Sequence, residues 1–171
     1  YMVRLKPALE ARGFEVAVFH ATGMGGRAFE ALAAEGAFAC VFDFAPQEVG
    51  NHLMGSQISA GADRMTNVGG AGLPQILSIG CYDLVDFVGW QDPPERLRGQ
   101  EIHAHNRLLS SVMMTTDQRR AMAQEICSKL ATAKGDTVFL LPVQGGNEWD
   151  RPGGPLHDAA GMEGFIEEMR A

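Results

Sequence analysis

Glycines gather where the neighbouring residues predict that a strand gives way to a helix. The run Thr22-Gly23-Met24-Gly25-Gly26-Arg27 follows the apolar residues 14–20. The first turn of a helix has free backbone N–H groups and a partial positive charge, and glycines let a ligand come close to the backbone. Arg27 could hold a phosphate with two hydrogen bonds, and the Thr22 hydroxyl could donate a third. This run predicts a site for an anionic, phosphate-bearing ligand.

The same run also has a purely conformational interpretation. Its spacing is neither Gly-x-Gly-x-x-Gly nor a triphosphate-binding loop that ends in Gly-Lys-Ser/Thr. A tight connection between a strand and a helix favours glycine whether or not a ligand binds there. Both interpretations stay open at the level of sequence.

Two further loops have a similar composition. Ser59-Ala60-Gly61-Ala62-Asp63-Arg64 precedes a predicted helix, in which Asp63 would complement the helix dipole and Arg64 would be solvated if the loop is only structural. A long polar loop at residues 144–155 follows the most apolar predicted strand, and ligands of open parallel sheets bind beyond the carboxyl ends of strands. The candidate ligand contacts are Thr22, Gly23, Gly25, Gly26, Arg27, Gly61, Gln144, Gly145, Gly146, Gly153 and Gly154.

Acid–base candidates are present without a diagnostic spacing. Histidines and aspartates flank several predicted strand ends, and proton transfer needs hydrogen-bond reach that a sequence does not give. The candidates are Asp43, Asp83, His105, Asp150, His157 and Asp158, of which His105, Asp150 and Asp158 would lie near a bound anion if the protein is an enzyme. Cys81 follows Gly80 and is a weaker candidate nucleophile, because no partner histidine is evident.

Composition excludes several classes of function. The 171 residues carry a formal net charge of −7, which disfavours direct binding to nucleic acid or anionic membranes. No apolar run reaches the roughly 20 residues that span a bilayer, and the first ten residues do not resemble a secretory signal. The three cysteines are widely spaced and form no zinc pattern. We therefore expect a cytoplasmic protein that binds no metal.

The order of predicted elements indicates an α/β fold with a mainly parallel sheet. Residues 14–20 and 37–44 read as strands joined through a helix that Gly36 ends, which makes a βαβ unit. Further strands are expected at residues 74–79, 101–105 and 137–143, and helices at 46–54, 62–70, 117–133 (capped by Thr116) and 158–170. Apparent helices at both ends predict a single domain, residues 1–171, that is part of a larger protein.

The ordered series of motifs resembles a family of long-uncharacterised bacterial, fungal and plant proteins, whose best-known member is a plant protein of resistance to tomato mosaic virus. The resemblance rests on residues 19–28, residues 59–64, His105-Asn106, and residues 141–158, which open with Leu141-Pro142. It covers nearly the whole chain and matches the second of two α/β domains. The family's usual Gly-Val-Ser-like turn after Leu141-Pro142 is replaced here by Val143-Gln144-Gly145-Gly146.

The resemblance implies a Rossmann-like three-layer sandwich, ATP binding and self-association as a dimer. The leading hypothesis is a domain that binds a nucleotide, ATP, or another phosphate anion. An enzyme acting on a small carboxylate or phosphorylated metabolite is the first alternative. A structural or interaction domain of a larger assembly, in which the glycines serve tight turns alone, is the second.

Overall fold

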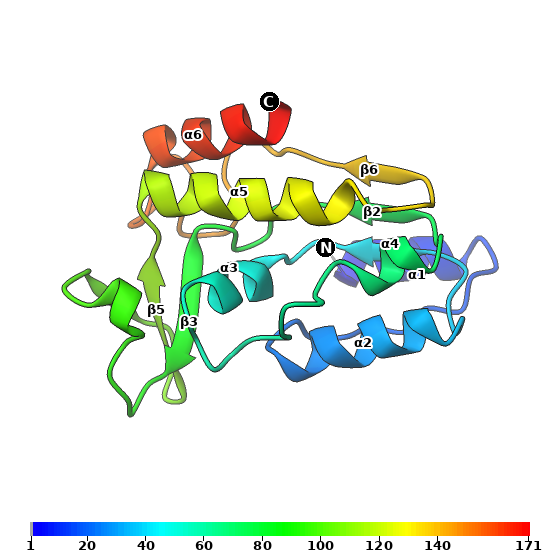
Figure 1. Ribbon diagram of the computed structural model, residues 1–171, viewed down its shortest axis with the longest axis horizontal. Coiled ribbons are helices and arrows are strands. Elements are labelled where there is room, and N and C mark those ends of the chain that lie inside the picture. Colours follow the sequence, from blue (N-terminus) through cyan, green and yellow to red (C-terminus); the bar gives the residue numbers. More distant parts are fainter. Residues whose placement is uncertain (1) are drawn as a thin grey trace.

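The computed structural model describes residues 2–171, and its strands form two small sheets of different kinds (Figure 1). The first sheet is parallel, in the order β1 (Val41–Asp43), β2 (Gln75–Leu77), β6 (Thr137–Phe139). The second is antiparallel, in the order β3 (Leu84–Val88), β5 (Leu109–Met113), β4 (Ile102–Ala104). The α/β class is confirmed, whereas the three-layer Rossmann-like sandwich with a mainly parallel sheet is not.

Helices α3, α5 and α6 pack against the sheets and enclose the main core. In Figure 1, α5 and α6 lie side by side along one edge of the molecule and α2 along the other. The helices are α1 (Met2–Glu10), α2 (Met24–Ala34), α3 (Gln47–Leu53), α4 (Asn67–Gly70), the 3-10 turn η1 (Glu95–Leu97), α5 (Thr116–Leu130) and α6 (Ala159–Arg170). The main core joins α3, α5 and α6 to both sheets, and a smaller cluster of Phe29, Ala33 and Val68 joins α2 to α4.

The first predicted strand differs from the structure. Residues 14–20 run extended beside residues 38–45, with which they border one cavity, but within residues 2–171 they pair with no strand. The predicted helix at residues 62–70 is also shorter and forms only as α4. The predicted βαβ unit therefore lacks its first strand, because residues 14–20 do not pair with β1.

Of the antiparallel sheet, the sequence predicts only β4, at residues 101–105, because polar residues interrupt β3 and β5. Asp86 lies in the middle of β3 and Ser111 in β5, and the two are cross-strand partners. The Ser111 hydroxyl donates to the Asp86 carboxylate at 2.5 Å, so that both side chains are buried with their hydrogen bond made. A strand with a buried polar pair lacks the alternating or continuous apolar pattern by which strands are found in a sequence.

Helix α5 begins one residue before the predicted position. Thr115, not Thr116, is the N-cap; its side chain accepts from the Gln118 amide at 3.3 Å. The Gln118 side chain accepts in return from the Thr115 amide at 2.9 Å, which completes a capping box.

Thr115→Ala tests this cap. The substitution leaves the Gln118 amide without its acceptor, and we expect it to lower the free energy of unfolding by about 1 kcal/mol. Ser128→Ala, at an exposed position of the same helix, is the control and should change it by less than about 0.5 kcal/mol. Urea unfolding followed by circular dichroism measures both, and equal midpoints for the two variants would contradict the capping role.

Candidate functional site

The ends of the parallel strands meet a cavity of about 540 Å³. Residues 14–21 form one wall and residues 37–45 the other, and Gly80, Cys81, Gly146 and Asn147 close it where the parallel strands end. The approach to the first glycine turn and the loop after β6 thus border one space. This is the edge at which open parallel sheets bind ligands.

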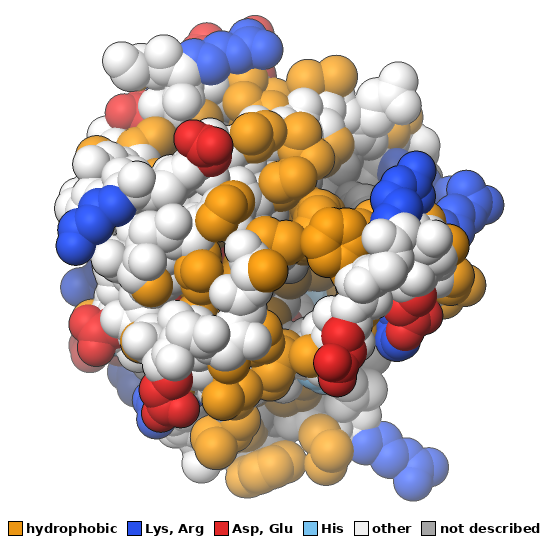
Figure 2. Space-filling view, turned by 90° about the vertical axis from the view of Figure 1, so that its right-hand side faces the viewer, with side chains coloured by type: hydrophobic (Ala, Val, Ile, Leu, Met, Phe, Trp, Pro, Cys, Tyr) orange, Lys and Arg blue, Asp and Glu red, His pale blue; other side chains and the backbone are white. Residues whose placement is uncertain are grey.

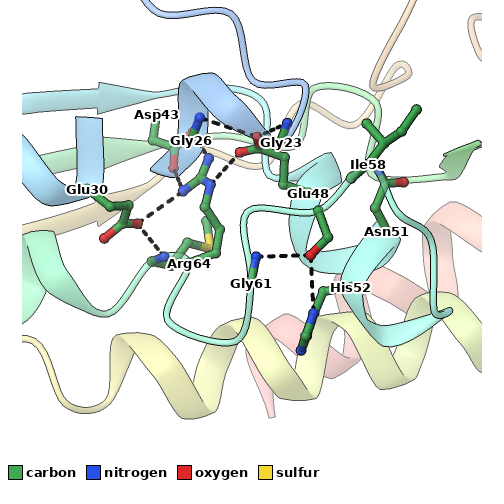
Figure 3. Close-up of polar contacts among 12 residues, drawn as sticks. Gly23, Gly26, Glu30, Asp43, Glu48, Asn51, His52, Ile58, Gly61 and Arg64 are labelled. Carbon is green, nitrogen blue, oxygen red and sulfur yellow. Dashed lines mark hydrogen bonds and ion pairs between the residues drawn. The ribbon is translucent and has the colours of Figure 1, made fainter. Parts of the chain in front are cut away.

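The backbone amides of the first glycine turn bind a carboxylate of the protein itself. The carboxylate of Glu48, from the first turn of α3, accepts from the backbone amides of Gly23 and Gly26 at the start of α2 (Figure 3). Glu48 is fully buried. The helix end thus attracts negative charge as the sequence predicts, but an internal carboxylate supplies that charge.

Two of the glycines are required by close packing. A Cβ atom at Gly25 would lie 1.9 Å from the carbonyl oxygen of His20, and one at Gly26 would lie 2.0 Å from a Glu48 carboxylate oxygen. Gly23, the N-cap, has φ +93°, a conformation that side chains rarely adopt. Glycine is therefore needed at these positions so that the start of α2 can pack closely against Glu48 and His20.

Glu48 belongs to a buried cluster of charges centred on Arg64. The Arg64 guanidinium holds Asp43 with two hydrogen bonds, of 2.5 and 2.9 Å, and Glu48 with one of 2.7 Å. Glu30 lies 3.4 Å away, and the ring of Phe29 packs against the guanidinium. Arg64 is 1% exposed, so the interpretation of this residue as solvated is wrong.

Glu30 satisfies a second group of backbone amides. Its carboxylate accepts from the amide of Met65 and from those of Asn67 and Val68, at 3.0 and 3.4 Å, where α4 begins. Burial raises the pKa of Glu30, an effect that Arg64 and these amides partly offset. Burial lowers the pKa of the Arg64 guanidinium, but the charges and hydrogen bonds of Asp43 and Glu48 outweigh this and raise it above its ordinary value, so Arg64 stays protonated.

The second predicted loop is bonded internally. The Gly61 amide donates to the Ser59 hydroxyl at 3.0 Å, and the Ser59 hydroxyl lies 3.1 Å from the Nδ1 atom of His52 (Figure 3). Gly61 has φ +93° and does not line the cavity. The role of this loop in the structure is to position Arg64 in the charge cluster.

The third loop reaches the cavity through Gly146 and Asn147. A Cβ atom at Gly146 would lie 2.6 Å from the Tyr82 ring, so glycine is needed there for packing. Gln144, Gly145, Gly153 and Gly154 do not border the cavity, and the last two form a turn beside Trp149. Of the loop's candidate ligand contacts, Gly146 alone lines the cavity.

Of the acid–base candidates, Asp43 borders the cavity, where it is bonded to Arg64, and the others do not line it. His105 packs against the Trp149 ring at 5.1 Å, as does His103 at 4.7 Å. Asp158 caps α6 by accepting from the Gly161 amide at 3.0 Å, and it pairs with Arg119 at 3.1 Å. Among residues 2–171, no group of three or more histidine, cysteine, aspartate or glutamate side chains is arranged to hold a metal ion.

A buried acidic pair stands behind the third loop. The Asn147 side chain donates to Asp83 at 2.7 Å, and the Gly146 amide donates to Asp150 at 3.0 Å. Each of the two aspartates has one further carboxylate oxygen that is inaccessible and accepts no hydrogen bond within residues 2–171. Burial, and then the charge of Asp150, raises the pKa of Asp83 to about 6.

Cys81 lines the cavity in an unusual backbone conformation, with φ +54°. Burial raises the pKa of its thiol to about 11, and the charges of Asp83 and Asp86 add to that effect. The thiol therefore stays protonated at neutral pH, which disfavours a role as a nucleophile.

The structure defines an α/β domain with a cavity at the end of a short parallel sheet. The chain belongs to the UPF0261 family: the model of this uncharacterised family's C-terminal domain matches residues 1–171. It is 51% identical, over 99% of its length, to a UPF0261 protein of Brucella melitensis, of which it covers 41%. Among residues 2–171, no helix has the length and apolar character needed to cross a membrane.

The chain is also similar to two tomato proteins whose names refer to resistance or susceptibility to ToMV. The chain is 30% identical, over 97% of its length, to the ToMV resistance protein Tm-1 of Solanum lycopersicum, and covers 22% of that protein. It is equally similar, at 30%, to the ToMV susceptible protein of the same plant. Because both tomato forms match alike, the similarity carries the fold of the domain and does not distinguish resistance from susceptibility.

Glu48→Ala tests the internal anion. It leaves two buried amides without an acceptor and removes one partner of Arg64, and we expect it to lower the free energy of unfolding by about 3 to 5 kcal/mol. Glu48→Gln keeps an acceptor oxygen for the amides and should cost less, so it remains measurable if the alanine variant does not fold. Glu163→Ala, on the exposed side of α6, is the control. Urea midpoints that match the parent for both Glu48 variants would contradict the assignment.

Asp83→Asn tests the buried acidic pair through pH. Between its ordinary value of 3.8 and the raised value of about 6, Asp83 keeps its proton in the folded state and loses it in the unfolded chain. The stability of the parent should therefore fall as pH rises through this window, by up to about 3 kcal/mol. Asp83→Asn should lack this decline and be the more stable protein at pH 8, whereas Asp92→Asn, at an exposed position, should follow the parent. Thermal unfolding from pH 4 to 8 gives the comparison, and parallel curves for parent and Asp83→Asn would rule out the raised pKa.

Proposed function

We propose that this domain binds a nucleotide, ATP, in the cavity between residues 14–21 and residues 37–45. The observation that carries the proposal is the position of this cavity, which ends where β1 and β2 end and where the loop after β6 begins. Its volume of about 540 Å³ lies within the range of about 300 to 1,000 Å³ that small-molecule sites occupy.

The walls of the cavity suit a flat aromatic group. Phe19, Phe38 and Phe42 line it, and the rings of Phe19 and Phe38 meet edge to face with their centres 5.9 Å apart. A purine base gains both apolar burial and ring contacts among such side chains. His20 and Asn147 also line the cavity, and their polar groups can orient the ligand.

Phosphate binding rests on the donors that Glu48 leaves free. The amides of Met24 and Gly25 have no acceptor within residues 2–171, and Arg27 is exposed on the first turns of α2. Ala21 borders the cavity directly before this turn. Because the Glu48 carboxylate already balances part of the helix dipole, Arg27 becomes the chief source of positive charge for a phosphate group.

Calorimetric titration of the full-length family protein with ATP and with adenosine tests the proposal. ATP should bind more tightly than adenosine, because only ATP offers charge to Arg27 and to the free amides. Equal affinities would remove the phosphate contact, and the absence of binding by either ligand would remove the nucleotide site. Tighter binding of inorganic triphosphate than of ATP would assign the site to a phosphate anion without a base.

Arg27→Ala should weaken ATP binding by about 1.5 to 3 kcal/mol, the usual contribution of a hydrogen bond to a charged group, and leave adenosine binding unchanged. Arg107→Ala is the matched control, since Arg107 is an exposed arginine in the turn between β4 and β5, away from the start of α2. Titration of the two variants beside the parent makes the measurement. If the two variants retain the same ATP affinity, Arg27 plays no part in the site.

A further inference from the structure

One face of the parallel sheet carries a row of apolar side chains that is covered only in part. Phe42, Ile76 and Val138 are register partners across β1, β2 and β6, so their side chains point to the same side. Leu140 continues this side two residues beyond Val138. Val138 is 50% exposed and Leu140 is 46% exposed. We call this side, defined by these four residues, the open face.

The middle strand of the same sheet is covered on its opposite side. Leu77 of β2 is completely buried in the main core with residues of α5, and Gln75 of β2 is 3% exposed. Strands of parallel sheets are ordinarily buried on both sides, because the connections between them place helices on both faces. The exposure of Val138 and Leu140, beside a strand that is buried on its other side, therefore marks an unfilled contact.

Helix α1 covers the open face only in part. Arg4, Leu5 and Ala8 of α1 face Phe44, Ser78 and Leu140 across a cavity of about 640 Å³. None of the residues of α1 is buried, and Val3 is 91% exposed. Figure 2 shows hydrophobic side chains gathered along a hollow at the end of the molecule that carries α1, with charged side chains around it.

We infer that the open face is the surface on which the rest of the longer family proteins packs. The chain spans 41% of the length of its Brucella relatives, and the matching family domain is C-terminal, so most of each relative precedes this domain. Because α1 lies over the open face, the preceding chain enters there. A tethered segment meets this surface at a high effective concentration, which favours it over a second copy.

The occupant should be apolar at its centre. Val138, Leu140 and Phe44 offer it no charge, and Arg4 is the one cation among the residues that border the cavity beneath α1. We expect a pair of helices to cover the open face, with aliphatic residues at the centre of the contact and a carboxylate that meets Arg4. Such a pair would form the missing layer against the sheet.

Cysteine accessibility in the full-length family protein tests the inference. Val138→Cys places a thiol on the open face with little change in volume, and Leu108→Cys places one in the turn between β4 and β5. The parent side chains are 50% and 64% exposed in this domain. Alkylation by a small maleimide, read for each peptide by mass spectrometry, separates these thiols from Cys40, Cys81 and Cys127.

The thiol at position 138 should react at least tenfold more slowly than the one at position 108, and the ratio should not change when the protein is diluted. Similar rates at both positions would overturn the inference, and so would protection that disappears on dilution, because a second copy would then cover the face. Val138→Asp should also lower the melting temperature of the full-length protein more than Leu108→Asp does. Equal effects of the two aspartates would overturn the inference as well.

Discussion

The buried guanidinium of Arg64 is the interaction on which this end of the domain depends. It joins Glu30 of α2, Asp43 of β1 and Glu48 of α3, so three elements that are distant in sequence meet at one side chain. Removing charges from water is costly, and the cost is offset only when each charge finds a partner and its remaining lone pairs are bonded. Here the spare oxygens of Glu30 and Glu48 accept backbone amides, which fixes the starts of α4 and α2 as well.

This cluster explains why the glycine turn looks like a phosphate loop. A helix end that approaches a buried carboxylate needs the same features as one that approaches a phosphate: free amides, positive φ and no Cβ atoms in the way. The sequence predicts a bound phosphate at this helix end, whereas in the structure the Glu48 carboxylate accepts from the Gly23 and Gly26 amides. The sequence has no signal for this anion, because Glu48 stands in the first turn of a helix, where exposed glutamates are common.

The sequence predicts those elements of the fold that depend on local signals, and it misses those that depend on partners distant in the chain. Helices α2, α5 and α6 and strand β2 follow apolar periodicity and nearby caps, and they lie within a few residues of their expected positions. Strands β3 and β5 depend on the pairing of Asp86 with Ser111, and burial of Arg64 depends on partners 16 to 34 residues away. Such partnerships are properties of the assembled chain, whereas periodicity and capping are local.

The ligand cavity and the open face share part of their walls. Leu5 of α1 and Phe44, just beyond β1, border both the cavity of about 540 Å³ and the one beneath α1. A segment that packs on the open face therefore presses on two side chains that also shape the ligand cavity. Thermodynamic linkage makes such an effect reciprocal: if the packed segment tightens the cavity around a ligand, the ligand strengthens the packing by the same free energy. Helix α1 would transmit that coupling, because none of its residues is buried and it is therefore loosely packed.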